Sequence, residues 1–244
     1  MNSLPKQVDA FIAEVQQLWD VPGVAVAVVR RDGPVHVRAY GVRSVATSVP
    51  ADIDTAFAVG SCSKAFTSRL AAALVDAAVI GWDDPIRKYL PSFQLYDPWI
   101  SDHVTFRDVL ANRTGLSRAS VGEYGSDLSR AEILHQARYI QPIAGFRDQL
   151  TYCNVGYAAA AEAMARSVGH PFDDVMDEYL LRPLGLSQRT TSDVSCMTTN
   201  NVAAPHYKVD GKVQTVPPIS MDNLLGAAGQ TMSARDAIMM VLPE

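Results

Sequence analysis

The sequence predicts an α/β protein that begins with a short antiparallel sheet and continues as a mostly helical chain. A run of Val and Ala over residues 24–29 is typical of a buried strand, and residues 35–40 alternate between apolar and polar side chains. The Asp32-Gly33 pair between these segments favours a tight turn, so we expect a β-hairpin. From residue 61 to about 185, the sequence contains a series of segments with apolar residues at helical spacing, which begin at capping residues and end at glycines.

The elements before residue 92 are predicted in order. Apolar side chains at helical spacing predict a helix over residues 6–18, which ends before Pro22-Gly23. After the hairpin, a long helix is predicted over 63–80 because apolar and small residues continue as far as Gly81. Residues 83–91 indicate a short helix, since one proline stands in its first turn and another after its end.

Caps and stops predict the later helices. Thr105 is a good cap for a short helix, Ser129-Arg130-Ala131-Glu132 is a capping box for a helix over 129–139, and Gly169 ends an alanine-rich helix over 155–168. The remaining expectations are a loop over 92–104, a helix over 171–181, a turn compatible with a second hairpin at Asp210-Gly211, a flexible Gly226–Gly229 segment and a last helix from Ser233.

Composition and charge exclude several classes of function. The chain has 244 residues, of which 48% are hydrophobic and 19% charged, and this is ordinary for a soluble globular enzyme. The net charge of −5 argues against nucleic acid or an anionic membrane as a partner, and no apolar run reaches membrane-spanning length. The N-terminus lacks a basic segment followed by an apolar one, so we expect a cytoplasmic location.

Three cysteines and five histidines indicate neither a disulfide framework nor a metal site. Neither a C-x-x-C pair nor an H-x-x-x-H pair occurs in the sequence. We therefore expect no metal and no cofactor.

The candidate nucleophile is Ser61, at the start of the long predicted helix. Lys64 follows three residues later, so both side chains share one face of that helix. Serine is a poor nucleophile until a neighbouring base takes its proton, and a partly desolvated lysine is able to act as that base. Free N–H groups at the helix start would stabilise negative charge that develops near Ser61. The S-x-x-K pattern is a known catalytic signature.

The motif alone leaves a second interpretation open. Ser61 could be a helix N-cap, with Lys64 as a solvated residue of the first turn. Ser3-Leu4-Pro5-Lys6 also matches S-x-x-K, but it lies at the chain terminus, where a closed cleft is not expected. The Ser61 copy is followed by the apolar and small-residue run at 70–75, as a buried helix requires.

A second candidate element is Tyr152-Cys153-Asn154, which precedes the alanine-rich helix. In extended backbone, Tyr152 and Asn154 would point the same way and so face one cleft. Tyr152 would then relay a proton to or from Ser61 or a leaving group, and Asn154 would bind Lys64 or a substrate amide. In the alternative interpretation, Tyr152 packs on the core and Asn154 caps the next helix.

These segments together resemble the serine β-lactamase and penicillin-binding-protein superfamily, above all class C β-lactamases and the related esterases and D-amino-acid peptidases of the CubicO type. The matching segments, in family order, are Phe57–Leu70, Thr105–Leu116, Tyr152–Val168, Arg182–Thr191 and Gly229-Gln230-Thr231-Met232-Ser233-Ala234-Arg235-Asp236. The resemblance implies the β-lactamase-like (DD-peptidase) fold, in which a mostly helical region packs on an antiparallel sheet with flanking helices, with the active site between them.

By this resemblance Ser61 is the acylated nucleophile, Lys64 its activating partner, Tyr152 the proton relay and Asn154 the contact to Lys64 and the substrate amide. The implied organisation has three segments. Residues 1–60 form the N-terminal helix and hairpin of an α/β region, 61–224 form the mostly helical region with the motifs, and 225–244 return to the α/β region, which is truncated.

The sequence departs from the family in two places. The family carries a third motif, Lys-Thr-Gly or His-x-Gly, on a strand that supplies one oxyanion-hole N–H, and this chain has neither. We therefore expect that it is a fragment and that its sheet is incomplete. Asn112-Arg113-Thr114-Gly115-Leu116 also replaces the usual His-Thr-Ser-Gly-Leu. We interpret this second departure as a scaffold difference.

The sequence thus predicts a serine hydrolase that forms an acyl-enzyme on a small-molecule or short-peptide ester or amide, of unknown oligomeric state. Two alternatives stay open: a penicillin-binding-like protein that binds its ligand without turnover, and a purely structural domain. Cys62 and Cys153 occupy the variable positions of the two motifs. Buried packing is favoured for both over a cysteine nucleophile, because no histidine accompanies either one in sequence.

Overall fold

A computed structural model describes residues 6–117, 125–186 and 201–241. The helices are α1 (Lys6–Leu18), α2 (Ser63–Asp76), α3 (Pro98–His103), α4 (Phe106–Leu110), α5 (Arg130–Gln136), α6 (Asn154–Val168), α7 (Phe172–Met176) and α9 (Ala234–Val241). The strands are β1 (Gly23–Arg30), β2 (Gly33–Ser44), β3 (Val49–Pro50), β4 (Phe57–Ala58), β5 (His206–Val209), β6 (Lys212–Thr215) and β7 (Thr231–Met232). Short 3₁₀ or π turns lie at Gly60–Cys62, Ile86–Lys88, Ala137–Tyr139, Asp177–Leu181 and Asp222–Leu224.

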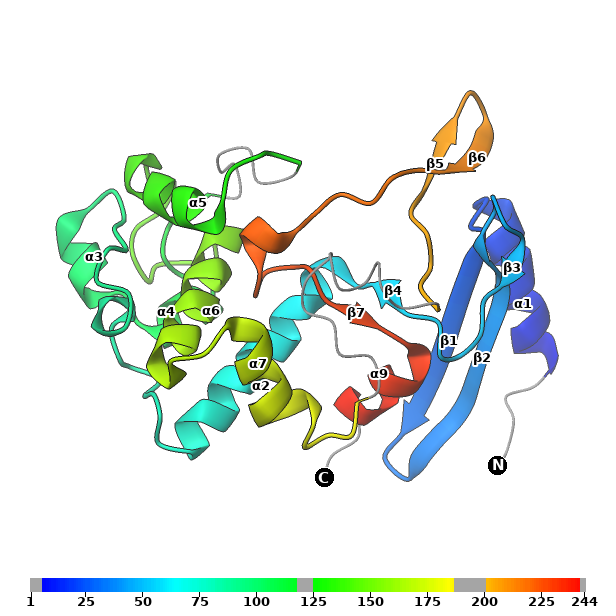
Figure 1. Ribbon diagram of the computed structural model, residues 1–244, viewed down its shortest axis with the longest axis horizontal. Helices are drawn as coiled ribbons and strands as arrows, with labels where there is room; N and C mark the ends of the chain where they lie inside the picture. Colours follow the sequence, from blue (N-terminus) through cyan, green and yellow to red (C-terminus); the bar gives the residue numbers. More distant parts are fainter. Residues whose placement is uncertain (1–5, 118–124, 187–200, 242–244) are drawn as a thin grey trace.

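The N-terminal sheet has the strand order β1-β2-β3, and both pairings are antiparallel. The predicted hairpin is confirmed, because β1 pairs with β2 from Gly23 opposite Gly41 to Arg30 opposite Gly33. Figure 1 shows α1 on one side of this sheet and α9 on the other. Asp9 of α1 accepts hydrogen bonds from Arg38 and Tyr40, which are two residues apart and therefore lie on the same face of β2.

The second hairpin, β5–β6, is also confirmed, with Asp210 and Gly211 at positive φ in its turn. It extends beyond the body of the molecule beside the N-terminal sheet (Figure 1). His206 Nε2 accepts a hydrogen bond from the Val45 backbone N–H at 3.1 Å, and Lys208 forms an ion pair with Asp20 at 2.6 Å. The segment after residue 201 therefore contacts the N-terminal sheet. The division of the chain into three segments stays a prediction.

The core of the helical region is built on α6. Eleven of its 15 residues are buried, and Glu162 and Arg166 lie on its more exposed side. The alanines at 158–161 leave room for close neighbours, and α2 packs against α6 through its own buried face, which includes Leu70 and Leu74. In the described part of the chain, no helix is both long and apolar enough to cross a bilayer.

Three expectations about helix limits are wrong. The short helix predicted over 83–91 is only a 3₁₀ turn at Ile86–Lys88, and Pro85 before it has extended backbone. The helix predicted over 63–80 ends at Asp76, because Ala78 adopts positive φ and the Val79 N–H turns back to the Leu74 carbonyl. The loop predicted over 92–104 contains α3, whose N-cap Asp97 accepts hydrogen bonds from two backbone N–H groups and is followed by a proline.

Asp108 in α4 joins two separate segments of the helical region. Its carboxylate is fully buried and accepts hydrogen bonds from Arg113 at 2.7 Å and from Arg147 at 2.8 and 2.9 Å. Burial alone would raise the pKa of this carboxyl, but the hydrogen bonds from Arg147, Thr105 and Arg113 outweigh burial and lower the pKa to about 2.

This ion-pair network predicts acid sensitivity. In the unfolded chain Asp108 titrates near 3.8, so its contribution to stability is complete above about pH 4 and is lost as the pH falls toward about 2. The contribution is on the order of 2 kcal/mol. Urea unfolding at several pH values should show a steeper loss of stability between pH 4 and 2 in the wild type than in Asp108→Asn. Parallel curves would contradict this assignment.

Candidate active site

The turn that carries Ser61 is fixed by a short strand pair. β4 pairs with β7, and the Val59 N–H continues the pairing by donating to the Gln230 carbonyl at 3.0 Å. Gly60 then adopts a φ of +52°, and a 3₁₀ turn over Gly60–Cys62 leads into α2. Ser61 is exposed in this turn, two residues before the first residue of α2.

Lys64 lies one turn into α2 and is only 8% exposed. Its ammonium group donates to Ser61 Oγ at 3.2 Å, to Asn154 Oδ1 at 2.8 Å and to the Ala227 carbonyl at 2.9 Å. These three neutral oxygens satisfy the three N–H donors of a protonated lysine. The interpretation of Lys64 as a solvated residue is therefore wrong. Cys62, not Ser61, is the N-cap of α2, so the capping interpretation of Ser61 is wrong as well.

Tyr152 contacts both Ser61 and Lys64. Its hydroxyl donates to Ser61 Oγ at 2.6 Å, and its ring centroid is 4.7 Å from Lys64 Nζ. Asn154, two residues later, is 2% exposed and binds the same lysine. Asn154 is the first residue of α6, whose N-cap is Cys153, so the alternative in which Asn154 caps this helix is wrong. The structure thus brings all four predicted site residues together.

Two further participants were not predicted from the sequence. The Ala227 carbonyl reaches Lys64 because Gly226, at a φ of +89°, packs directly on α6, where a Cβ atom would lie 2.6 Å from Ala161 Cβ. The expectation of a flexible 226–229 segment is wrong, since Ala227 is buried and the Gly226 carbonyl accepts a hydrogen bond from Thr67 at 2.7 Å. A backbone carbonyl has no signature in sequence; only the glycines at 226 and 229 marked this turn.

The second is Ser63, which is fully buried two residues after Ser61. Its hydroxyl donates to the Gly60 carbonyl at 2.6 Å and accepts from the Gln230 N–H at 3.2 Å. Ser63 therefore ties the turn that carries Ser61 to β7. No distinctive spacing marked this serine in the sequence.

The two cysteines differ in environment. Cys153 is buried at 2% exposure, so the packing interpretation is confirmed for this residue. Cys62 is exposed beside Ser61, so the same interpretation is wrong for Cys62. Its position inside the surface turn at the helix mouth explains the difference.

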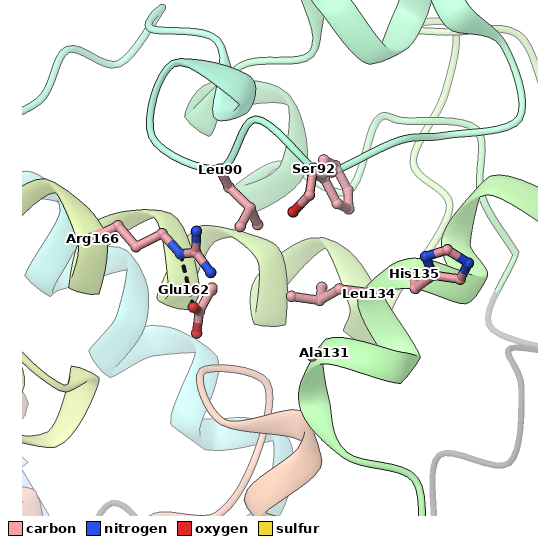
Figure 2. A pocket seen from close by; sticks show the side chains of 8 residues that line it. Leu90, Ser92, Ala131, Leu134, His135, Glu162 and Arg166 are labelled. Carbon is pink, nitrogen blue, oxygen red and sulfur yellow. Dashed lines mark hydrogen bonds and ion pairs between the residues drawn. The ribbon is translucent and has the colours of Figure 1, made fainter.

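A separate cavity of about 140 Å³ lies among the helices of the helical region (Figure 2). Leu90, Phe93 and Leu134 form its apolar part, while Arg166 and Glu162 form an ion pair at 3.0 Å along its edge. None of the four predicted site residues lines it. The cavity is thus distinct from the candidate active site.

A family model described as beta-lactamase matches residues 11–242. The chain belongs to the beta-lactamase family. It is 31% identical to an unguisins hydrolase of Aspergillus campestris over 215 residues, which cover 84% of this chain and 40% of the relative. It is also 31% identical to penicillin-binding protein 4 of Amycolatopsis lactamdurans over 177 residues, which cover 70% of this chain and 45% of the relative.

Solved structures confirm the predicted fold of this beta-lactamase family member. A class C β-lactamase from Rhodobacter sphaeroides superposes with a TM-score of 0.75 at 22% identity, covering 95% of this chain and 63% of that chain. The sheets described here are small and incomplete by comparison. The chain spans about half the length of the curated relatives it matches, at 40% and 45% for the two named above.

The role of Ser63 predicts a loss of stability in Ser63→Ala. This change leaves the buried Gln230 N–H without its acceptor, so the free energy of unfolding should fall by about 1–3 kcal/mol. The matched control is Cys62→Ala, which truncates an exposed side chain in the same turn that makes no capping hydrogen bond, and it should change stability by less than about 0.5 kcal/mol. Urea denaturation measures both, and equal losses in the two variants would contradict the prediction.

Proposed function

We propose that the protein is a serine hydrolase that forms an acyl-enzyme on an ester or amide, with Ser61 as the nucleophile. The observation that carries this proposal is the pair of hydrogen bonds on one oxygen. Ser61 Oγ lies 3.2 Å from Lys64 Nζ and 2.6 Å from the Tyr152 hydroxyl. A serine contacted by two titratable groups has a path for its proton, which an isolated serine lacks.

In the proposed reaction, Ser61 Oγ attacks the substrate carbonyl carbon and its proton moves to the Lys64–Tyr152 pair. For this transfer one member of the pair must be deprotonated, since the resting geometry has both groups donating to Ser61. The tetrahedral intermediate then collapses, the C–O or C–N bond breaks, and the pair returns the proton to the leaving group. Water attacks the acyl-enzyme by the same route and regenerates the serine hydroxyl.

Lys64 and Asn154 act from the buried side of the site. Asn154 Oδ1 and the Ala227 carbonyl fix the position of the lysine nitrogen, and the third hydrogen bond of this nitrogen is made to Ser61. Asn154 would also contact the substrate amide. The proposed substrates are small molecules or short peptides with an ester or amide bond, which agrees with relatives named for hydrolysing unguisins and for binding penicillin. No cofactor takes part in these steps.

Covalent labelling tests the proposal. The protein is exposed to a fluorophosphonate and, separately, to a penicillin, and intact mass is measured. We expect a single adduct that maps to Ser61 and is absent from Ser61→Ala. Equal labelling of Ser61→Ala would sink the assignment of the nucleophile. A folded protein that takes no adduct would favour a binding protein without turnover.

The contact between Asn154 and Lys64 predicts a change in pH dependence. In Asn154→Asp, a carboxylate replaces the amide oxygen that lies 2.8 Å from the lysine nitrogen, and this stabilises the protonated lysine. The labelling rate at pH 7 should fall about tenfold or more, and it should recover as the pH is raised. The measurement is the pH profile of labelling for both proteins. A rate that stays low at every pH would instead indicate damage to the fold.

A further inference from the structure

The loop that carries Tyr152 is held by the segment just after α4. We propose that Asn112 is a positioning residue that fixes the Tyr152 hydroxyl against Ser61 by binding the backbone on both sides of the tyrosine. This inference rests on the proposed function for its effect on rate. The hydrogen bonds between Asn112 and the Tyr152 loop are observed in the structure and do not depend on that function.

Asn112 occupies the position after a helix where glycine is the usual residue. Its φ is +52°, and α4 ends with two backward hydrogen bonds, from the Asn112 N–H to the Val109 carbonyl at 3.2 Å and from the Arg113 N–H to the Asp108 carbonyl at 3.0 Å. This pattern is a Schellman motif, which favours glycine because its closing residue is left-handed. Asparagine tolerates the same conformation and adds a side-chain acceptor.

Both oxygen atoms of Asn112 bind the Tyr152 loop. Its backbone carbonyl accepts from the Thr151 N–H at 2.7 Å, and its side-chain Oδ1 accepts from the Cys153 N–H at 3.0 Å. Tyr152 is the single residue between these two anchored amides. Its Cα atom therefore has little freedom, and its hydroxyl is held 2.6 Å from Ser61 Oγ.

The rest of the loop has independent support. The Ile143 N–H donates to the Gly115 carbonyl at 2.9 Å, and the Arg147 N–H donates to the Arg113 carbonyl at 2.8 Å. Arg147 is further tied to the buried Asp108. Loss of the Asn112 side chain should therefore leave the loop docked and release only the amide that follows Tyr152.

Two substitutions separate the side chain from the backbone. Asn112→Gly keeps the left-handed conformation and the backbone carbonyl but removes Oδ1. Asn112→Asp is the matched control, because a carboxylate oxygen can accept the same Cys153 N–H. With a fluorophosphonate probe, Asn112→Gly should label Ser61 about 10- to 100-fold more slowly, and Asn112→Asp should stay within about threefold of the wild type. Both variants should melt within a few degrees of the wild type.

Amide exchange gives a readout that does not depend on activity. In ¹⁵N-labelled protein, the Cys153 amide should exchange faster in Asn112→Gly than in the wild type, whereas the Thr151 amide, bound to the backbone carbonyl, should change little. The inference would be overturned if Ser61 in Asn112→Gly were labelled at the wild-type rate, or if labelling slowed equally in both variants. It would also be overturned if the exchange rate of the Cys153 amide did not change in Asn112→Gly. If Ser61 is not labelled even in the wild type, the proposed function fails, and the exchange of Cys153 still decides whether Asn112 holds this loop.

Discussion

The site depends on the hydrogen bonds of the Lys64 side-chain nitrogen. This nitrogen binds oxygens of Ser61, Asn154 and Ala227, from three segments of chain, the last two lying 90 and 163 residues away from it. A buried amino group is costly unless its hydrogen bonds are satisfied, so this one nitrogen favours structures in which all three segments meet. The same contacts that stabilise Lys64 also place it beside Ser61.

Backbone conformation decides whether those segments can reach the lysine. Gly60, Asn112 and Gly226 all have positive φ, and each stands where the chain turns sharply beside the site. Gly60 begins the turn of Ser61, Gly226 brings the Ala227 carbonyl inward, and Asn112 ends α4 under the loop of Tyr152. The reactive side chains are therefore arranged by turns that carry no reactive group.

Much of this arrangement could be predicted from sequence. Ser61 and Lys64 lie three apart and Tyr152 and Asn154 two apart, and such spacings fix relative position within one helix or one extended segment. The start of α2 and the start of α6 are distant in sequence, and only the joint order of the motifs indicated that they meet. The Asp97-Pro98 pair is a cap signal for α3, and it lies inside the segment predicted as a loop.

The sequence could not reveal hydrogen bonds that join distant segments. Examples are the bond from Lys64 to the Ala227 carbonyl, the two bonds that Asn112 accepts from the Tyr152 loop, and the bond that Ser63 accepts from Gln230. An alanine or an isolated serine has no sequence pattern that would indicate such a contact. The early end of α2 at Asp76 is similar, because Ala78 takes a left-handed conformation with no glycine to mark it.

Exposure completes the physical picture of the site. Ser61 is exposed, Tyr152 is partly exposed, and Lys64 and Asn154 are buried behind them. The Ser61 oxygen is therefore open to solvent, while bulk water has little access to the lysine nitrogen. Because water is largely excluded around Lys64, its hydrogen bond to Asn154 acts more strongly than it would in water, and this bond holds the lysine beside Ser61.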